Sequence, residues 1–163
     1  MVEYAKAGFD GCAVSQDGTN FLSERVPSGL KNQNTGHKSS HTARAVNLSV
    51  SHRRRVLHAT RCLDGSWNDM TLQIFDKLMV DMREGEYDDI TFELFEWDDV
   101  EITTIVYHGI WGVVDNGYTI CSTAIPPLKV SGTLAEHRFS EWGESLRKDV
   151  ECTIGILKRR YLL

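Results

Sequence analysis

Short stretches of alternating apolar and polar residues characterise the first half of the chain, and this pattern is typical of half-buried β-strands. Residues 12–17 form the first stretch and are followed by a glycine, so we expect a short strand that ends at Asp17. Residues 42–51 and 55–62 alternate in the same way and predict two more strands joined by a hairpin turn. The intervening residues 23–40 are rich in Ser, Asn, Gly and Lys and predict a loop.

Helical spacing dominates the second half of the chain. Apolar residues recur every three or four positions from Met70 to about Arg83, and again from about Glu136 onward, which predicts two helices, the second long and amphipathic. Between them, residues 110–114 are continuously apolar, as expected of a strand covered on both faces. Residues 90–95 alternate and predict an edge strand or hairpin with charged flanks. This order of strands and helices predicts an α/β fold with a mixed sheet.

The length and composition restrict the class of protein. A chain of 163 residues is the usual size of one domain with one core. No apolar run approaches the roughly 18 residues that span a bilayer, and the N-terminus lacks the layout of a signal peptide, so we expect an intracellular protein. The cysteines form no Cys-x-x-Cys pair, which argues against a zinc knuckle or a disulfide framework. We expect reduced, mostly buried thiols at Cys12, Cys62, Cys121 and Cys152.

Charge is strongly segregated along the chain although the net charge is only −5. Residues 25–63 contain no Asp or Glu but carry eight Lys or Arg and four of the six histidines. Residues 64–101 contain thirteen acidic residues against two basic ones, so we treat the acidic part around 85–99 as an insertion in the core fold. One part of the surface could meet phosphates while another repels them. Two ordinary solvated faces are the simpler interpretation of such charge runs.

Four carboxylates stand at positions from which a folded chain could bring them together. Asp17 ends the first predicted strand, and Asp115 directly follows the continuously apolar one. Asp69 begins the first predicted helix, and Glu151 lies beside the apolar stripe of the last. Hard cations such as Mg²⁺ and Mn²⁺ take oxygen ligands and often need only one or two carboxylates besides water and substrate phosphate. These acids are therefore candidate metal ligands.

Clustered carboxylates repel one another and raise each other's pKa unless a cation is present. Two divalent ions about 3.5–4 Å apart can activate a water or a 3′-hydroxyl and stabilise the leaving oxygen of a phosphodiester. For each acid taken alone, a structural role explains the residue equally well. Asp17 and Asp115 could be turn residues, and Glu151 could form an ion pair with Arg147 one helical turn earlier.

Local sequence blocks extend this interpretation. The blocks are GCAVSQDGT at 11–19, DGSWNDMTL at 64–72, VDNGY at 114–118, SEWGES at 140–145 and RKDVECTIGILKRR at 147–160. Together they resemble the signature blocks of PIF/Harbinger-type DDE transposases, the DDE superfamily endonuclease or plant transposon protein family. The resemblance runs from about residue 8 to the last residue, with the blocks in the family's order. It implies an α/β, ribonuclease H-like mixed sheet flanked by helices, with an acidic insertion before the fourth core strand.

The resemblance assigns a role to each acid. It makes Asp17, Asp115 and Glu151 the catalytic acids, which would hold divalent metal ions, Mg²⁺ or Mn²⁺, with Asp17 bridging them. Asp69 matches a further acid that is often counted with the metal ligands, but it could instead cap a helix, so Asp115 is the preferred second ligand. Arg147 would lie one turn before Glu151 and orient its carboxylate.

The implied protein is a metal-dependent DNA endonuclease and strand transferase, with residues 1–163 forming a single catalytic domain truncated at both ends. DNA at transposon ends and at the target would be the substrate, with a Myb-like protein as a possible partner, an oligomer as a possible form, and the nucleus as the location. Basic residues of the last helix offer charge for phosphates: Lys148, Lys158, Arg159 and Arg160. The alternative is a decayed or domesticated domain that keeps the fold and binds DNA or protein without cutting.

Overall fold

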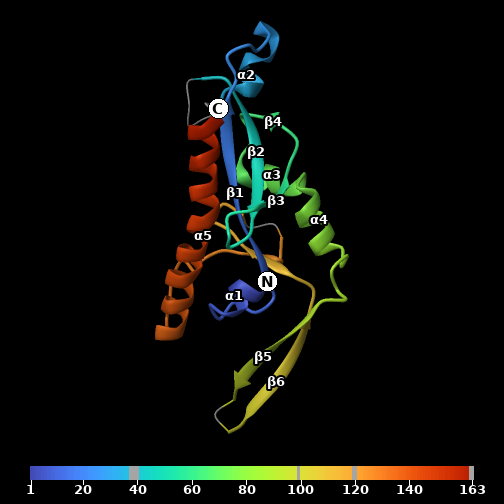
Figure 1. The fold of residues 1–163 in the computed structure, drawn as a ribbon, viewed down its shortest axis with the longest axis vertical. Coiled ribbons are helices and arrows are strands. Elements are labelled where there is room, and N and C mark those ends of the chain that lie inside the picture. The colour runs from blue at the N-terminus through green and yellow to red at the C-terminus, as the bar shows by residue number, and fades with distance from the viewer. Residues whose placement is uncertain (37–40, 99, 119–120, 162–163) are drawn as a thin grey trace.

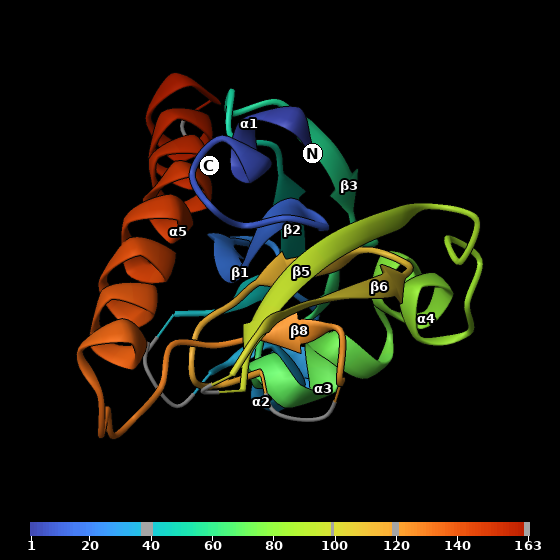
Figure 2. The same ribbon diagram turned by 90° about the horizontal axis from the view of Figure 1, so that it is seen from below.

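A mixed β-sheet lies at the centre of the molecule, with helices on both of its faces (Figure 1). The computed structural model describes residues 1–36, 41–98, 100–118 and 121–161. The long helix α5 (Leu134–Tyr161) packs along one face of the sheet. Helices α3 (Asp69–Ile74) and α4 (Lys77–Arg83) lie on the other side, as the view along the molecule also shows (Figure 2).

The sheet combines antiparallel and parallel pairs. Its central strand β1 (Cys12–Leu22) is antiparallel to β2 (Ala43–Val50), which is in turn antiparallel to β3 (Val56–Ala59). On its other edge β1 runs parallel to β7 (Trp111–Val113), and β7 runs parallel to β8 (Ala124–Ile125). The order β3-β2-β1-β7-β8 confirms the predicted α/β fold with a mixed sheet.

The first strand is longer than its sequence pattern predicts. It does not end at Asp17 but continues to Leu22, because the ladder with β2 is unbroken and places Asp17 opposite Leu48. Gly18 is needed for space and not for a turn. A Cβ atom on Gly18 would lie 2.8 Å from Oδ1 of Asp69, so a larger residue here would displace the side chain of Asp69.

The single helix predicted from Met70 to about Arg83 is wrong, because the structure divides this segment into α3 and α4. The side chain of Asp76 starts the second helix. Its Oδ1 accepts hydrogen bonds from the backbone N–H groups of Leu78 at 3.0 Å and Met79 at 3.2 Å, as the N-cap of α4. A buried capping carboxylate at this point interrupts the helical pattern.

Several short elements were not predicted. They are α1 (Val2–Ala5), the 3₁₀ turn η1 (Ser28–Leu30), α2 (Lys31–Asn34), β4 (Leu63–Asp64), which pairs with β2, and the two-residue strand β8. Two of them, η1 and α2, fall within the loop predicted over 23–40. The last part of that predicted loop, 37–40, lies outside the described residues.

The acidic stretch contains a separate two-stranded hairpin. Strand β5 (Thr91–Trp97) is antiparallel to β6 (Ile102–His108), and the hairpin projects away from the central sheet (Figure 1). Of the two predicted forms, edge strand or hairpin, the hairpin is the one observed. Phe92 anchors it at its base, where a Cβ on Gly11 would lie 2.3 Å from the Phe92 ring.

Strand β2 is buried on both faces, whereas its alternating pattern predicted a half-buried strand. Its apolar residues Val46, Leu48 and Val50 pack against Val150 and Ile154 of α5. Asn47 and Ser49 lie on the opposite face, which the pattern assigned to solvent. There α3 packs against β2, and Asp76, the N-cap of α4, accepts a hydrogen bond from Asn47.

The cysteines are free thiols, as predicted, but the expectation that they are mostly buried is wrong for two of them. Cys12 and Cys121 are buried, and Cys62 and Cys152 are exposed. In the described part of the chain, no helix combines the length and the apolar character that crossing a membrane requires.

Candidate functional site

The four candidate acids come from four separate elements. Asp17 lies in the middle of β1, and Asp115 directly follows β7. These two strands are parallel neighbours, and Ser15 of β1 pairs with Val113 of β7. Asp17 follows Ser15 by two residues, and Asp115 follows Val113 by two residues. Because side chains alternate along a strand, both aspartates are expected on the same face of the sheet. Asp69 is the first residue of α3, and Glu151 lies on α5.

The carboxylates of Asp69 and Asp115 converge on the backbone of Gly117. The N–H of Gly117 donates to Oδ1 of Asp115 at 2.7 Å. A Cβ built on Gly117 would lie 2.9 Å from that same oxygen and 2.9 Å from Oδ2 of Asp69. Asp115 is the second metal ligand preferred from the sequence, and Asp69 is the other candidate. The structure brings the two carboxylates close to each other at Gly117.

The charges of Asp69 and Asp115 also act on Asp17. Burial is the main cause that raises the pKa of Asp17 from 3.8 to about 6. The guanidinium of Arg147 opposes this shift, and the negative charges of Asp115 and Asp69 add to it. The side chain of Asp17 is 21% exposed, so it remains accessible to solvent from one side. The three aspartates thus form one cluster whose charges repel each other.

Arg147 stands between Asp17 and Glu151. Its Nη2 lies 2.7 Å from Oε1 of Glu151, and its Nη1 lies 3.9 Å from Oδ2 of Asp17. Its Nε is 3.5 Å from Glu144, and its backbone carbonyl accepts a hydrogen bond from Ser15. The predicted contact between Arg147 and the Glu151 carboxylate is present.

The donor set fits a hard cation by its chemistry, because carboxylate oxygens are what Mg²⁺ and Mn²⁺ prefer. The arrangement of these carboxylates does not form a complete metal site. Among the residues that the structure describes, no group of three or more His, Cys, Asp or Glu side chains is arranged so that it could hold a metal ion. Asp69 and Asp115 approach each other at Gly117, and the carboxylate of Glu151 is paired with Arg147.

The predicted alternative for Asp69, a helix N-terminal cap, is wrong in detail. The N-cap of α3 is Asn68, whose Oδ1 accepts from the backbone N–H of Thr71 at 2.9 Å. Asp69 follows the cap in the first turn of α3, which leaves its carboxylate on the side of Gly18 and Gly117.

A buried polar network lies next to the acids, and no local sequence pattern indicated it. Oδ2 of Asp76 accepts hydrogen bonds from the side-chain amides of Asn47 at 2.6 Å and Gln16 at 3.3 Å. Gln16 also donates to Ser49 at 2.7 Å. The hydroxyl of Tyr118 donates to Oδ1 of Asn47 at 2.6 Å, three residues after Asp115.

All five side chains of this network are fully buried. Burial raises the pKa of Asp76, while its hydrogen bond from Asn47 and the nearby His58 oppose the shift. Burial also raises the pKa of Tyr118 far above its ordinary range, with further contributions from the charges of Asp69 and Asp17. Tyr118 is therefore a neutral hydrogen-bond donor that packs beside the acids.

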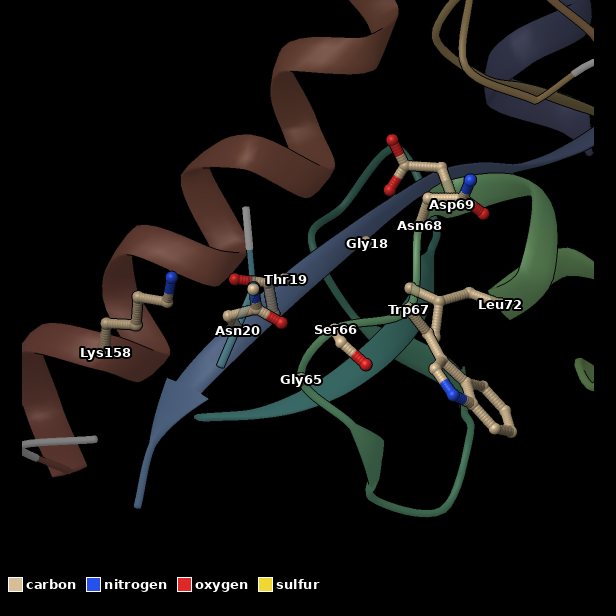
Figure 3. A pocket seen from close by; sticks show the side chains of 11 residues that line it. Gly18, Thr19, Asn20, Gly65, Ser66, Trp67, Asn68, Asp69, Leu72 and Lys158 are labelled. Atoms are coloured by element: carbon tan, nitrogen blue, oxygen red, sulfur yellow. The ribbon is translucent and has the colours of Figure 1, made fainter. Parts of the chain in front are cut away.

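A pocket with a volume of about 330 Å³ opens beside the acid cluster, between β1, the segment before α3 and α5 (Figure 3). Asp69 lines it at one end and Lys158 at the opposite side (Figure 3). The other lining residues are Gly18, Thr19, Asn20, Gly36, Gly65, Ser66, Trp67, Asn68 and Leu72. Spacing and composition could not have revealed this pocket, since its walls come from four distant segments.

Fold and site together define an α/β domain with a mixed sheet and a cluster of carboxylates gathered at the adjoining strands β1 and β7. The family model described as "Plant transposon protein" matches residues 3–163, so the chain belongs to this transposon-derived family. No curated protein and no solved structure matches the chain significantly.

Proposed function

We propose that the chain is the catalytic domain of a PIF/Harbinger-type DDE transposase, with a ribonuclease H-like fold, that cuts and joins DNA with divalent metal ions. The observation that carries this proposal is that the carboxylates of Asp69 and Asp115 approach each other at Gly117 and that their charges raise the pKa of Asp17. Arg147 of α5 lies between Asp17 and Glu151. The acids come from distant parts of a chain that belongs to a transposon protein family.

The order of the elements supports the finer assignment of the fold. The six strands of the sheet are joined by antiparallel pairs among β1, β2, β3 and β4 and by parallel pairs from β1 to β7 and from β7 to β8. The first acid lies on the first strand, a second acid just after β7, and the last acid on the final helix. These are the positions that the resemblance to ribonuclease H-like transposases implies.

In this proposal Asp17, Asp115 and Glu151 would hold the divalent metal ions, and Asp69 would offer a further carboxylate oxygen. Bound Mg²⁺ or Mn²⁺ supplies an activated water and stabilises the oxygen that leaves. The oxygen of that water bonds to the phosphorus, the bond from phosphorus to the 3′-oxygen breaks, and a 3′-hydroxyl is released. The oxygen of that hydroxyl then bonds to a phosphorus of the target DNA. The bond from this phosphorus to the target's 3′-oxygen breaks, and that oxygen leaves as a hydroxyl after taking up the proton.

Arg147 has a positioning role in this scheme. Its guanidinium holds the carboxylate of Glu151 at 2.7 Å and that of Asp17 at 3.9 Å, and its positive charge reduces the repulsion between them. To hold a metal ion, the carboxylate of Glu151 would have to leave this ion pair. The proposal includes transposon ends and target DNA as substrates, a Myb-like protein and further copies of the chain as possible partners, and the nucleus as the location.

Nicking of supercoiled DNA by the purified chain in Mn²⁺ tests the proposal. Asp17→Ala and Glu151→Ala should each reduce the rate by at least about a hundredfold, as removal of a charge-stabilising group does in other enzymes. Glu141→Ala is the matched control, because Glu141 lies on the same helix and pairs only with His137 among the described residues. Activity that survives in both site variants would refute the assignment of the acids.

A second candidate function is favoured by one observation, namely that Glu151 is engaged by Arg147 and no described group of three acids is ready to hold a metal ion. A decayed or domesticated domain would keep this arrangement and bind DNA or protein without cutting. A wild-type chain that is folded, binds DNA and is as inactive as its Asp17→Ala variant would favour this second function.

A further inference from the structure

The pocket beside the acid cluster is continuous with the candidate site. Asp69 belongs to both, since it lines the pocket and its carboxylate meets that of Asp115 at Gly117. Gly18 follows Asp17 on β1 and forms part of the pocket floor (Figure 3). A molecule in the pocket therefore lies next to the position where the acids would act.

The size of the pocket restricts what can enter it. Its volume of about 330 Å³ is at the low end for pockets that enclose a small molecule. Backbone forms a close wall, because a Cβ on Gly36 would lie 2.7 Å from the carbonyl oxygen of Gly65. One nucleotide of a DNA strand matches this space, whereas a base pair with both strands does not.

The lining chemistry also fits a nucleotide. Lys158 is the one cation among the lining residues described, and its amino group lies 5.8 Å from the ring centre of Phe21. The neutral polar side chains of Thr19, Asn20 and Ser66 offer hydrogen bonds to a sugar or a base edge. Such a mixture suits a charged phosphate at one side and a neutral polar group in the middle.

Lys158 stands on α5 seven residues after Glu151, which is almost two full turns and therefore on nearly the same side of the helix. The rise of the helix separates the two positions by roughly 10 Å along its axis. A strand whose scissile phosphate is beside Glu151 would thus present a different phosphate to Lys158. This spacing favours a neighbouring phosphate of the same strand.

We infer that the pocket binds the single unpaired nucleotide next to the scissile phosphodiester, with Lys158 contacting its phosphate and Asn20 and Ser66 contacting its sugar or base. This inference rests on the proposed function, because it assumes that DNA is the substrate. It assigns to the protein a preference for DNA whose end is unpaired. Separation of that nucleotide from the duplex would also bring the bond to be cut within reach of the acids.

Fluorescence anisotropy in EDTA measures this preference without cleavage. The probes are a labelled duplex of random sequence with flush ends and the same duplex with a two-nucleotide single-stranded overhang. The wild-type chain should bind the overhang duplex about tenfold more tightly, the effect of one or two good charge-assisted hydrogen bonds. Lys158→Gln and Ser66→Leu should lose this preference, Lys158→Gln by removing the cation and Ser66→Leu by filling the pocket.

Lys148→Gln is the matched control, because Lys148 is an exposed lysine of the same helix that does not line the pocket. It should weaken binding to both probes equally and keep the preference. Thermal unfolding checks that every variant is folded. A wild-type chain without the preference overturns the inference, and so does a preference that survives in both pocket variants. If DNA nicking fails while the overhang preference and its loss in the variants are observed, the proposed activity is wrong and the nucleotide pocket stands.

Discussion

Two groups of buried side chains on opposite faces of the β1–β2 pair differ in chemistry. Toward α5, strand β2 presents Val46, Leu48 and Val50, which are at most 6% exposed and pack against apolar residues of that helix. Toward α4, the same pair presents Gln16, Asn47 and Ser49, which are fully buried and are hydrogen-bonded to one another or to Asp76.

This difference separates two ways of holding a sheet together. Apolar packing is not directional and tolerates changes of shape, so the α5 face contributes mainly free energy of folding. A buried polar face is stable only when each donor meets an acceptor, because an unsatisfied buried group costs about 1–3 kcal/mol. The polar face therefore fixes the position of its members, and one of them, Tyr118, lies next to the acid cluster.

The largest change in the free energy of unfolding is expected for Asp76, which accepts hydrogen bonds from Gln16 and Asn47. Asp76→Ala removes the cap of α4 and leaves the amides of Asn47 and Gln16 without their acceptor, which should lower the free energy of unfolding by about 4 kcal/mol. Urea denaturation measures the change. Asp81→Ala is the matched control on the same helix, since Asp81 pairs only with the exposed Lys77 in the described structure and should cost less than about 1 kcal/mol. Equal effects of the two variants would contradict a special role of the polar face.

On the apolar face, Leu48→Ala should lower the free energy of unfolding by about 3 kcal/mol, the usual cost of a cavity in a packed core. Leu57→Ala on β3 is the control, because Leu57 is 56% exposed and should change stability by less than about 0.5 kcal/mol. The same denaturation experiment compares them. A cost at Leu48 below about 1 kcal/mol would show that the α5 face is loosely packed.

The pH dependence of stability in the absence of metal tests the electrostatics of Asp17. Burial raises its pKa from 3.8 to about 6, so the folded state binds the proton more tightly than the unfolded state. This contribution is fully present below pH 4 and is lost as the pH rises through 6; it amounts to at most about 3 kcal/mol. Relative to Asp17→Asn, which cannot titrate, the wild-type chain should lose stability between pH 4 and pH 7. Parallel stability curves for the two proteins would rule out a raised pKa at Asp17.

The smallest change in the free energy of unfolding is expected for Tyr118, which donates a hydrogen bond to Asn47. Tyr118→Phe removes one hydroxyl and leaves Oδ1 of Asn47 without its donor, which should cost about 1.5 kcal/mol. Tyr107→Phe is the matched control, since Tyr107 is 42% exposed on the projecting hairpin and should change stability by less than about 0.5 kcal/mol. Thermal unfolding of both variants provides the comparison, and a neutral Tyr118→Phe would show that Asn47 is held by Asp76 alone.

Local periodicity predicted those elements whose pattern is set by neighbouring residues. Strand β2, the hairpin to β3 and the long helix α5 were predicted close to their observed bounds, because strand alternation and helical spacing are read over a few residues. The break between α3 and α4 was missed because it depends on Asp76, whose carboxylate is held by Gln16 and Asn47 from other strands. The four acids were identified from their local blocks, and their roles remain predictions.

The sequence alone determined which strand positions alternate, where the long helix runs and which acids are candidates, since all of these are local properties. Only the tertiary structure decided that the polar side of β2 is buried under α4, and that Asp69 joins Asp115 at Gly117. It also decided that Arg147 stands between Asp17 and Glu151. Burial and charge pairing depend on which distant segments pack together, and no short stretch of sequence contains that information.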